Sequence, residues 1–148
     1  MPKLLDRSLI GKVFEPFDVM VEAGRLRLFA KATGNDDPVF TDEGVAKSRG
    51  YRSIPAPPTY IFTLEMERAD PFDYLELLDI DPGSILHGEQ HFDYHQTVCA
   101  GDVLTFENLV ADIYDKKNGA LQFLVLETKV TDSQGADVAE MRRSIVVR

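Results

Sequence analysis

The sequence contains one cysteine, no tryptophan and only three histidines in 148 residues. A single cysteine cannot form an internal disulfide, and no Cys/His cluster has the spacing of a metal site. We expect a buried or half-buried, unreactive thiol at Cys99, with a reactive thiol as the alternative. No apolar run approaches the ~20 residues of a membrane-spanning helix. The first residues also lack the apolar core of a signal peptide, which predicts a cytoplasmic protein.

Positive charge is scarce too, because 16 Lys and Arg face 25 Asp and Glu and give a formal net charge of −9. The basic residues are scattered along the chain, so neither nucleic acid nor an anionic membrane is an expected partner. A chain of this length is expected to form one domain, residues 1–148, that buries roughly two thirds of its unfolded surface. There is no glycine-rich phosphate loop and no metal-ligand set, so we expect no cofactor.

The first half of the chain predicts short elements of both kinds. Residues 14–21 carry alternate apolar side chains, which predicts a strand, and Pro16 places its start at a sheet edge. Residues 22–33 change to helical spacing, and Gly34 can supply the left-handed residue that ends the helix. The turn formers of residues 35–40 predict a loop.

Residues 55–66 predict a buried central helix. They begin with prolines, which a first helical turn tolerates, and continue with apolar residues that face nearly every direction. One or two helical turns are also expected over residues 42–47. Residues 70–85 are mixed and contain an Asp-Pro-Gly break, which predicts a cover over one end of the domain.

The second half of the chain has the pattern of long strands. The turn formers Lys117-Asn118-Gly119 and Ser133-Gln134-Gly135 separate the later ones. Strands are expected over residues 87–98, 103–114, 121–131 and 138–147. With the first strand they predict about five antiparallel strands in an α+β domain.

One segment resembles the signature of the MaoC-like hydratase/dehydratase family. It runs from Lys31 to Lys47 and is followed by Gly50-Tyr51 and by Ala56-Pro57-Pro58-Thr59-Tyr60. The resemblance extends over about residues 11–147 and is closest to the non-catalytic subunits of heteromeric (3R)-hydroxyacyl-ACP dehydratases. It implies a hot-dog fold, in which a curved antiparallel sheet wraps around a central helix.

The resemblance also implies a substrate and a partner. The expected substrate is a 3-hydroxyacyl or enoyl chain carried by CoA or acyl carrier protein. The expected assembly is a dimer, either a homodimer or a heterodimer with a catalytic MaoC-like subunit.

The sequence departs from this family where the chemistry is expected. In the (R)-specific hydratases, the loop after the first helix has roughly the pattern Gly-Asp-x-Asn-Pro-x-His, and its aspartate and histidine manage a water and a proton. Gly34 and Pro38 match, but Asn35 stands at the aspartate position, Asp37 at the asparagine position and Phe40 at the histidine position. Neither Asn35 nor Phe40 can exchange a proton near neutral pH. We therefore expect these two residues to bind substrate.

The adjacent Asp36 and Asp37 are candidate catalytic carboxylates, since a shift of the loop by one residue would let them replace the missing one. The alternative is a turn in which the short polar side chains of residues 35–38 bond nearby backbone amides.

A row of ionisable residues at alternate positions of a predicted strand is the second candidate. Spacing of two places them on one face. They are His87, Glu89, His91, Asp93 and His95. A solvated sheet face is one interpretation; the other is that His91 acts as a catalytic group in a neighbouring subunit's cleft. The resemblance gives Glu89 and Gln90 a binding or pairing role.

The third candidate is the start of the predicted central helix, where Pro58, Thr59 and Tyr60 would meet a thioester carbonyl. Because prolines lack an N–H, the donors would be the amides of Thr59, Tyr60 or Ile61, and the alternative is that Thr59 only caps the helix. The large apolar residues nearby offer an acyl route or are plain core. They are Phe40, Tyr51, Tyr60 and Phe62.

Three functions follow from these patterns. The first is an acyl-thioester hydratase/dehydratase subunit that binds the acyl chain while a partner performs the chemistry. The second is a non-catalytic module that senses acyl thioesters. The third is a hot-dog thioesterase, in which Asp36 or Glu89 activates water.

Overall fold

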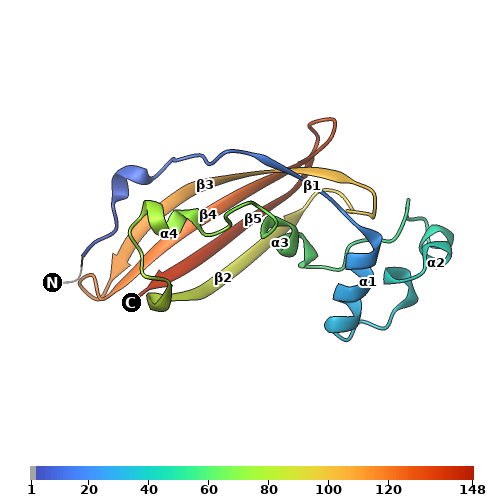
Figure 1. Cartoon of the computed structure of the whole chain (residues 1–148), viewed down its shortest axis with the longest axis horizontal. Coiled ribbons are helices and arrows are strands. Elements are labelled where there is room, and N and C mark those ends of the chain that lie inside the picture. Colours follow the sequence, from blue (N-terminus) through green and yellow to red (C-terminus); the bar gives the residue numbers. More distant parts are fainter. Residues whose placement is uncertain (1–2) are drawn as a thin grey trace.

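The computed structural model describes residues 3–148 and contains a five-stranded antiparallel sheet with the strand order β1-β3-β4-β5-β2. Figure 1 shows the sheet as a twisted, curved layer. The strands are β1 (Phe17–Met20), β2 (Ile85–Tyr94), β3 (Val103–Lys116), β4 (Leu121–Asp132) and β5 (Asp137–Val147). This is the predicted antiparallel α+β architecture.

Short helices complete the chain. The α-helices are α1 (Ala23–Ala32), α2 (Glu43–Ser48), α3 (Tyr60–Glu65) and α4 (Asp73–Leu77), and the 3-10 turns are η1 (Arg7–Leu9), η2 (Pro38–Phe40) and η3 (Pro82–Ser84). Helices α3 and α4 lie across one face of the sheet, whereas α1 and α2 lie beyond its end (Figure 1). Over residues 3–148 no helix has the length and apolar character required to cross a bilayer.

The structure confirms the predicted end of the first helix, the predicted turn at residues 117–119 and the predicted edge position of the first strand. Helix α1 ends where Gly34 adopts a φ of +71°, a left-handed conformation that glycine adopts without strain. The turn between β3 and β4 uses positive φ angles at Lys117, Asn118 and Gly119. The short strand β1 lies at a sheet edge, as its proline predicted.

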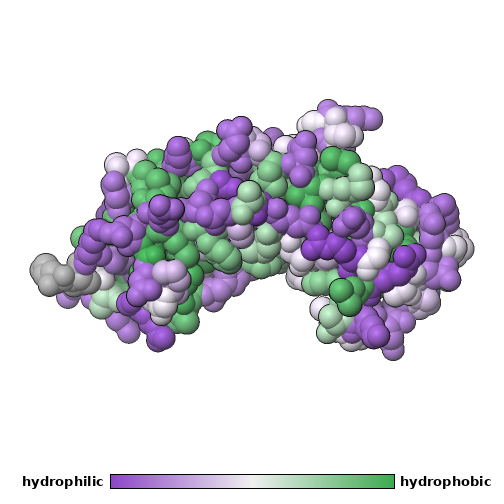
Figure 2. Space-filling model, viewed as in Figure 1, coloured by the Kyte–Doolittle hydropathy of each residue, from purple (hydrophilic) through white to green (hydrophobic). Residues whose placement is uncertain are grey.

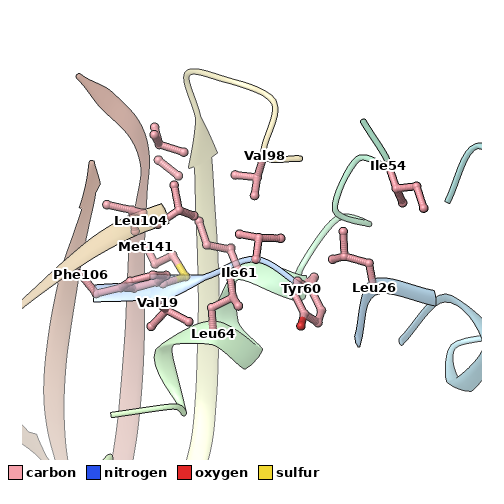
Figure 3. Packing of buried hydrophobic residues seen from close by; sticks show 14 residues of the cluster. Val19, Leu26, Ile54, Tyr60, Ile61, Leu64, Val98, Leu104, Phe106 and Met141 are labelled. Atoms are coloured by element: carbon pink, nitrogen blue, oxygen red, sulfur yellow. The ribbon is translucent and has the colours of Figure 1, made fainter. Parts of the chain in front are cut away.

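Helix α3 packs on what we call the inner face of the sheet. Ile61 is 2% exposed and Leu64 is fully buried. Figure 3 shows both side chains directed toward the sheet, with Tyr60 between this group and Leu26 of α1. The sheet contributes, among others, Leu104, Phe106 and Met141 to this cluster. A second buried cluster lies under α4, where Tyr74 and Leu75 cover one end of the sheet, as expected for residues 70–85.

The predicted central helix over residues 55–66 is wrong in its length, because α3 has only six residues. A proline disfavours helical φ/ψ in the residue before it and lacks the N–H of a helical hydrogen bond. Pro55, Pro57 and Pro58 therefore keep the chain out of a helix until Thr59. Pro55 instead forms an isolated bridge with Cys99.

The predicted strand over residues 87–98 also needs correction. The strand ends at Tyr94, where the regular pairing with β5 stops and the amides of His95 and Gln96 both donate to the one carbonyl of Val138. The pairing register shifts between His87 and Glu89. Such a bulge moves the following side chains to the opposite face, so the five ionisable residues do not share one face.

We predict that Leu64→Ala lowers the free energy of unfolding by about 2–5 kcal/mol, because it leaves a cavity between α3 and the sheet. Leu28→Ala is the matched control, since Leu28 also lies on a helix but is 67% exposed; we expect a change within about 0.5 kcal/mol. Equilibrium urea unfolding followed by circular dichroism measures both. Equal losses in the two variants would contradict the central role of α3.

Candidate functional site

The loop between α1 and α2 forms a turn held by its own polar side chains. The amide of Asn35 donates to the carbonyl of Ala30 at 2.8 Å, and the Asn35 Oδ1 accepts from the amide of Asp37 at 3.3 Å. Asp37 Oδ1 accepts from the amide of Val39 at 3.0 Å and so caps η2. The predicted turn is therefore confirmed.

Asp37 and Asp36 differ in their surroundings. The amide of Val39 holds the pKa of Asp37 below its usual range, and the guanidinium of Arg49 adds to this shift. Arg49 Nη1 donates to both carboxylate oxygens of Asp37, at 2.8 and 3.0 Å. Asp36 is exposed and makes no hydrogen bond or ion pair with the residues that the structure describes. The carboxylate of Asp37 is thus engaged, and that of Asp36 faces solvent.

The chain that leads into α3 is fixed to the turn before β3. The amide of Ala56 donates to the carbonyl of Val98, and the amide of Ala100 donates to that of Ile54, both at 2.8 Å. Arg52 donates to both carboxylate oxygens of Asp102, at 2.6 and 2.9 Å. These bonds place the start of α3 relative to the sheet. Within this turn Cys99 is 1% exposed, which confirms the expected buried thiol.

Thr59 occupies a strained position at the start of α3. Its φ is +73°, which is unfavourable for a β-branched residue, and its side chain makes no capping hydrogen bond. Thr59 therefore stands at the N-cap position, as the alternative expected, but its side chain does not cap the helix. Its amide donates to the hydroxyl of Tyr94 at 3.1 Å, and the amide of Tyr60 donates to the carbonyl of Pro57. Two of the three predicted donors, the amides of Thr59 and Tyr60, are therefore bonded within the chain.

A mainly apolar pocket of about 170 Å³ lies between the start of α3 and the end of β2. Its lining includes Ala56, Pro58, Ile61, Tyr94 and Val98. Burial raises the pKa of Tyr94 above its usual value. The outline of the molecule is indented between the sheet and the part that holds α1 and α2 (Figure 2). Of the predicted binding residues, Pro58 lines this pocket directly.

Other members of the predicted acyl route lie elsewhere. Tyr60 is 1% exposed and packs edge-to-face on Phe29, with ring centroids 5.0 Å apart. Burial raises its pKa. Tyr51 is 38% exposed, and Phe40 is half-buried at the end of η2. Phe62 is half-buried on α3 beside His87.

The β2 candidates divide between the two faces of the sheet. Gln90 is paired with the buried Arg143 and lies on the inner face. His87 lies on the same face, with its Nε2 3.2 Å from the Gln90 Oε1. Glu89 and His91 lie on the opposite face, where both side chains are 69% exposed and 3.7 Å apart. Within the described chain, His91 is thus separated by the sheet from α3.

The three predicted catalytic residues therefore do not meet in one chain. Asp36 and Asp37 lie in the loop beyond the end of the sheet, and His91 lies on its outer face. Asp93, His95 and Glu140 bring atoms of the metal-ligating kind within 4.8 Å of one another on that face. All three are exposed, and exposed carboxylates commonly lie this close without a metal ion.

A buried polar cluster at the end of α3 escaped the sequence analysis. It consists of Glu65, Asn108, Thr128 and Arg143, each at most 7% exposed. Asn108 Nδ2 and Thr128 Oγ1 both donate to Glu65 Oε1, and Asn108 Nδ2 also donates to Thr128 Oγ1 at 2.6 Å. The sequence did contain a sign of this cluster: a glutamate lies within an apolar helix, and polar residues lie at strand positions that face inward.

Comparisons with known proteins agree with this architecture. The family described as the FAS1-like dehydratase domain region matches residues 8–141. A UPF0336 protein of Streptomyces avermitilis is 34% identical over 146 residues, which cover 97% of this chain and 95% of that protein.

Two solved structures are similar over nearly the whole chain. One is a chain of the C-terminally truncated 3R-hydroxyacyl-ACP dehydratase complex HadBC of Mycobacterium tuberculosis, with a TM-score of 0.80 and 26% identity. The match covers 93% of this chain and 96% of that chain. The other is a MaoC-like dehydratase with a TM-score of 0.84 and 22% identity, where 95% of this chain matches 42% of the other. The predicted hot-dog fold and the resemblance to MaoC-like dehydratases are confirmed.

We predict that Asp37→Asn lowers stability at neutral pH but not in acid. The folded pKa of Asp37 lies below its usual value, so its carboxylate stabilises the fold above the unfolded pKa of about 3.9. That contribution is lost as the pH falls through the folded pKa. The urea midpoint of the wild type should therefore exceed that of Asp37→Asn at pH 7, and the gap should close below about pH 4.

Asp36→Asn is the matched control, because Asp36 lies next in the chain and is exposed without a partner among residues 3–148. We expect no pH-dependent gap for this variant. A gap of the same size in both variants would show that the bonds of Asp37 do not stabilise the loop.

Proposed function

The chain belongs to the family described as the FAS1-like dehydratase domain region, and from this premise we propose that it is the substrate-binding subunit of a 3-hydroxyacyl-thioester dehydratase. In this proposal a MaoC-like partner of the same fold supplies the acid-base groups. The substrate is a 3-hydroxyacyl or enoyl chain carried by CoA or acyl carrier protein, and the reaction removes or adds water across the α,β bond.

The absence of a convergent proton-carrying pair among the described residues carries this proposal. Hydration of an enoyl thioester needs a base that polarises water at the β-carbon and a donor at the α-carbon. Asn35 and Phe40 stand where the family pattern has these groups. The nearby carboxylate of Asp37 is bound by Val39 and Arg49, and His91 lies across the sheet. A second subunit can provide both groups without any change in this chain.

The free edge of β2 supports a partner of the same fold. Strand β2 has ten residues and pairs only with β5 among the strands that the structure describes. An exposed edge of this length is a ready template for another strand. Leu86 and Tyr94 are 48% and 44% exposed at the two ends of this strand. Pairing along this edge would bring a partner beside the pocket at the start of α3.

The apolar pocket supports the binding role. Ala56, Ile61 and Val98 give it walls suited to methylene groups, and Tyr94 offers a hydroxyl beside the amide of Thr59. A pocket of this kind can hold the acyl part of a thioester through burial of apolar surface. In this proposal the subunit contributes affinity and position, and the partner contributes the reaction.

We predict that the purified chain alone hydrates crotonyl-CoA at least on the order of 10²-fold more slowly than its mixture with a MaoC-like subunit that carries an intact Gly-Asp-x-Asn-Pro-x-His motif. Loss of the absorbance of the conjugated double bond measures the rate, and size-exclusion chromatography measures complex formation. Full activity of the chain alone would overturn the division of labour. Binding without turnover in the mixture would favour an acyl-thioester sensor, and release of free thiol would favour a thioesterase.

A double variant tests the two substituted positions directly. We expect Asn35→Asp/Phe40→His to give the chain hydratase activity above its own background, because each restored group contributes about 10²–10⁴-fold where the geometry is right. Asn35→Asp/Phe40→Leu is the matched control, since it restores the carboxylate but no imidazole. Equal rates for both variants would show that position 40 does not face the reacting atoms.

A further inference from the structure

Tyr94 brings a phenolic hydroxyl to the pocket between α3 and β2. It is the last residue of β2 and pairs with Ala139 of β5. Its ring stacks on that of the half-buried Phe92, with the ring centroids 5.9 Å apart and the planes 3° from parallel. Phe92 in turn packs against the core cluster that α3 shares with the sheet. Strand pairing and core packing therefore fix the position of this hydroxyl.

The hydroxyl accepts a hydrogen bond from the backbone and keeps its own hydrogen for another partner. The amide of Thr59 donates to the Tyr94 oxygen at 3.1 Å. Because the nitrogen of Thr59 is bonded to Pro58, which lines the pocket, the hydroxyl lies at this wall. A phenolic oxygen that accepts from an amide can still donate. Within residues 3–148 no acceptor takes its hydrogen, so this hydrogen is available to a ligand.

The backbone of Thr59 holds the donating amide in an unfavourable conformation. Its φ is +73°, and its side chain makes no hydrogen bond that would compensate at the start of α3. Strained residues of this kind gather at ligand sites, where the surrounding structure holds them in place. The bond to the Tyr94 hydroxyl is one of the contacts that hold Thr59. The amide and the hydroxyl thus form a prearranged pair.

The other polar side chains of the pocket are less suited to orient a ligand. They are those of Gln96 and Thr97. The Gln96 Nε2 donates to the carbonyl of Asp137 at 2.8 Å, which turns this side chain toward the start of β5. The hydroxyl of Thr97 has no bond to another described side chain or backbone group that would fix its direction. The pocket, of about 170 Å³, therefore offers one oriented donor beside mainly apolar walls.

We propose that the hydroxyl of Tyr94 donates a hydrogen bond to the carbonyl oxygen of the thioester bound in this pocket. This inference rests on the proposed function and adds the atom of this chain that meets the reacting group. A carbonyl accepts hydrogen bonds and has none to donate, so it complements a hydroxyl that already accepts from the Thr59 amide. That amide also polarises the hydroxyl and strengthens the bond that it donates.

The same hydrogen bond favours the proposed reaction. Negative charge develops on the thioester oxygen when a proton leaves or joins the α-carbon, and a donor in a fixed position stabilises this charge. The donor must keep its hydrogen at neutral pH. Burial raises the pKa of Tyr94, and the bond from Thr59 offsets this only in part, so the hydroxyl stays protonated. Tyr94 polarises the thioester, and the partner's groups exchange the protons.

The test compares two ligands that differ by one oxygen: butyryl-CoA, an unreactive thioester, and S-butyl-CoA, the thioether without the carbonyl. Calorimetric titration of the full-length chain measures both affinities. We expect the wild type to bind the thioester about five- to tenfold more tightly than the thioether. Tyr94→Phe should bind both ligands equally, with an unchanged affinity for the thioether, which also shows that its pocket is intact. Thr97→Val is the matched control, because it removes a hydroxyl from the same pocket and should keep the preference.

Infrared spectroscopy of butyryl-CoA labelled with ¹³C at the carbonyl gives a direct signature of the bond. The carbonyl stretch of the bound ligand should lie at a lower wavenumber in the wild type than in Tyr94→Phe. Equal band positions, or a thioester preference that survives in Tyr94→Phe, would overturn the role of Tyr94 and leave the proposed function standing. Loss of the preference in Thr97→Val alone would assign the donor to Thr97 and overturn it too. A wild type that does not bind butyryl-CoA would contradict the proposed function itself.

Discussion

The mutual burial of α3 and the inner face of the sheet is the constraint on which the rest of this structure depends. A six-residue helix is unstable by itself in water, and an apolar sheet face cannot remain exposed. Each therefore needs the other. Ile61 and Leu64 fix the helix on the strands, and the three prolines before Thr59 fix where it begins. The pocket between α3 and β2 exists because both of its walls are held by this packing.

The same short helix leaves a polar element in the interior. Since α3 ends at Glu65, its last side chain enters the core beside β3, β4 and β5 and brings a carboxylate against Arg143. A longer, fully apolar helix would have filled this space. The interior therefore contains two regions of different character: an apolar region at the start of α3 and a polar one at its end.

The positions of the polar and ionisable residues are the basis for the proposal that this chain binds substrate and a partner performs the reaction. The loop that resembles the family's sequence pattern keeps its turn through Asn35 and Asp37, but it carries neither an aspartate nor a histidine at the two positions where that pattern has them. His91 of β2 lies on the outer face of the sheet. In addition, the edge of β2 is unpaired among the strands that the structure describes, and the pocket lies beside it. These features agree with the proposal that the chain works beside a partner of the same fold.

The sequence by itself determined the succession of strands and helices along the chain and the turns at Gly34 and residues 117–119, since these follow from local periodicity and backbone preference. It also showed that Asn35 and Phe40 stand where the family pattern has an aspartate and a histidine. Only the tertiary structure decided the face on which His87 lies and the meeting of Glu65 with Arg143. A bulge at Gly88 and a contact between residues 78 positions apart depend on packing between distant segments. No local pattern contains that information, because it arises only when the strands pair and the helix is pressed against them.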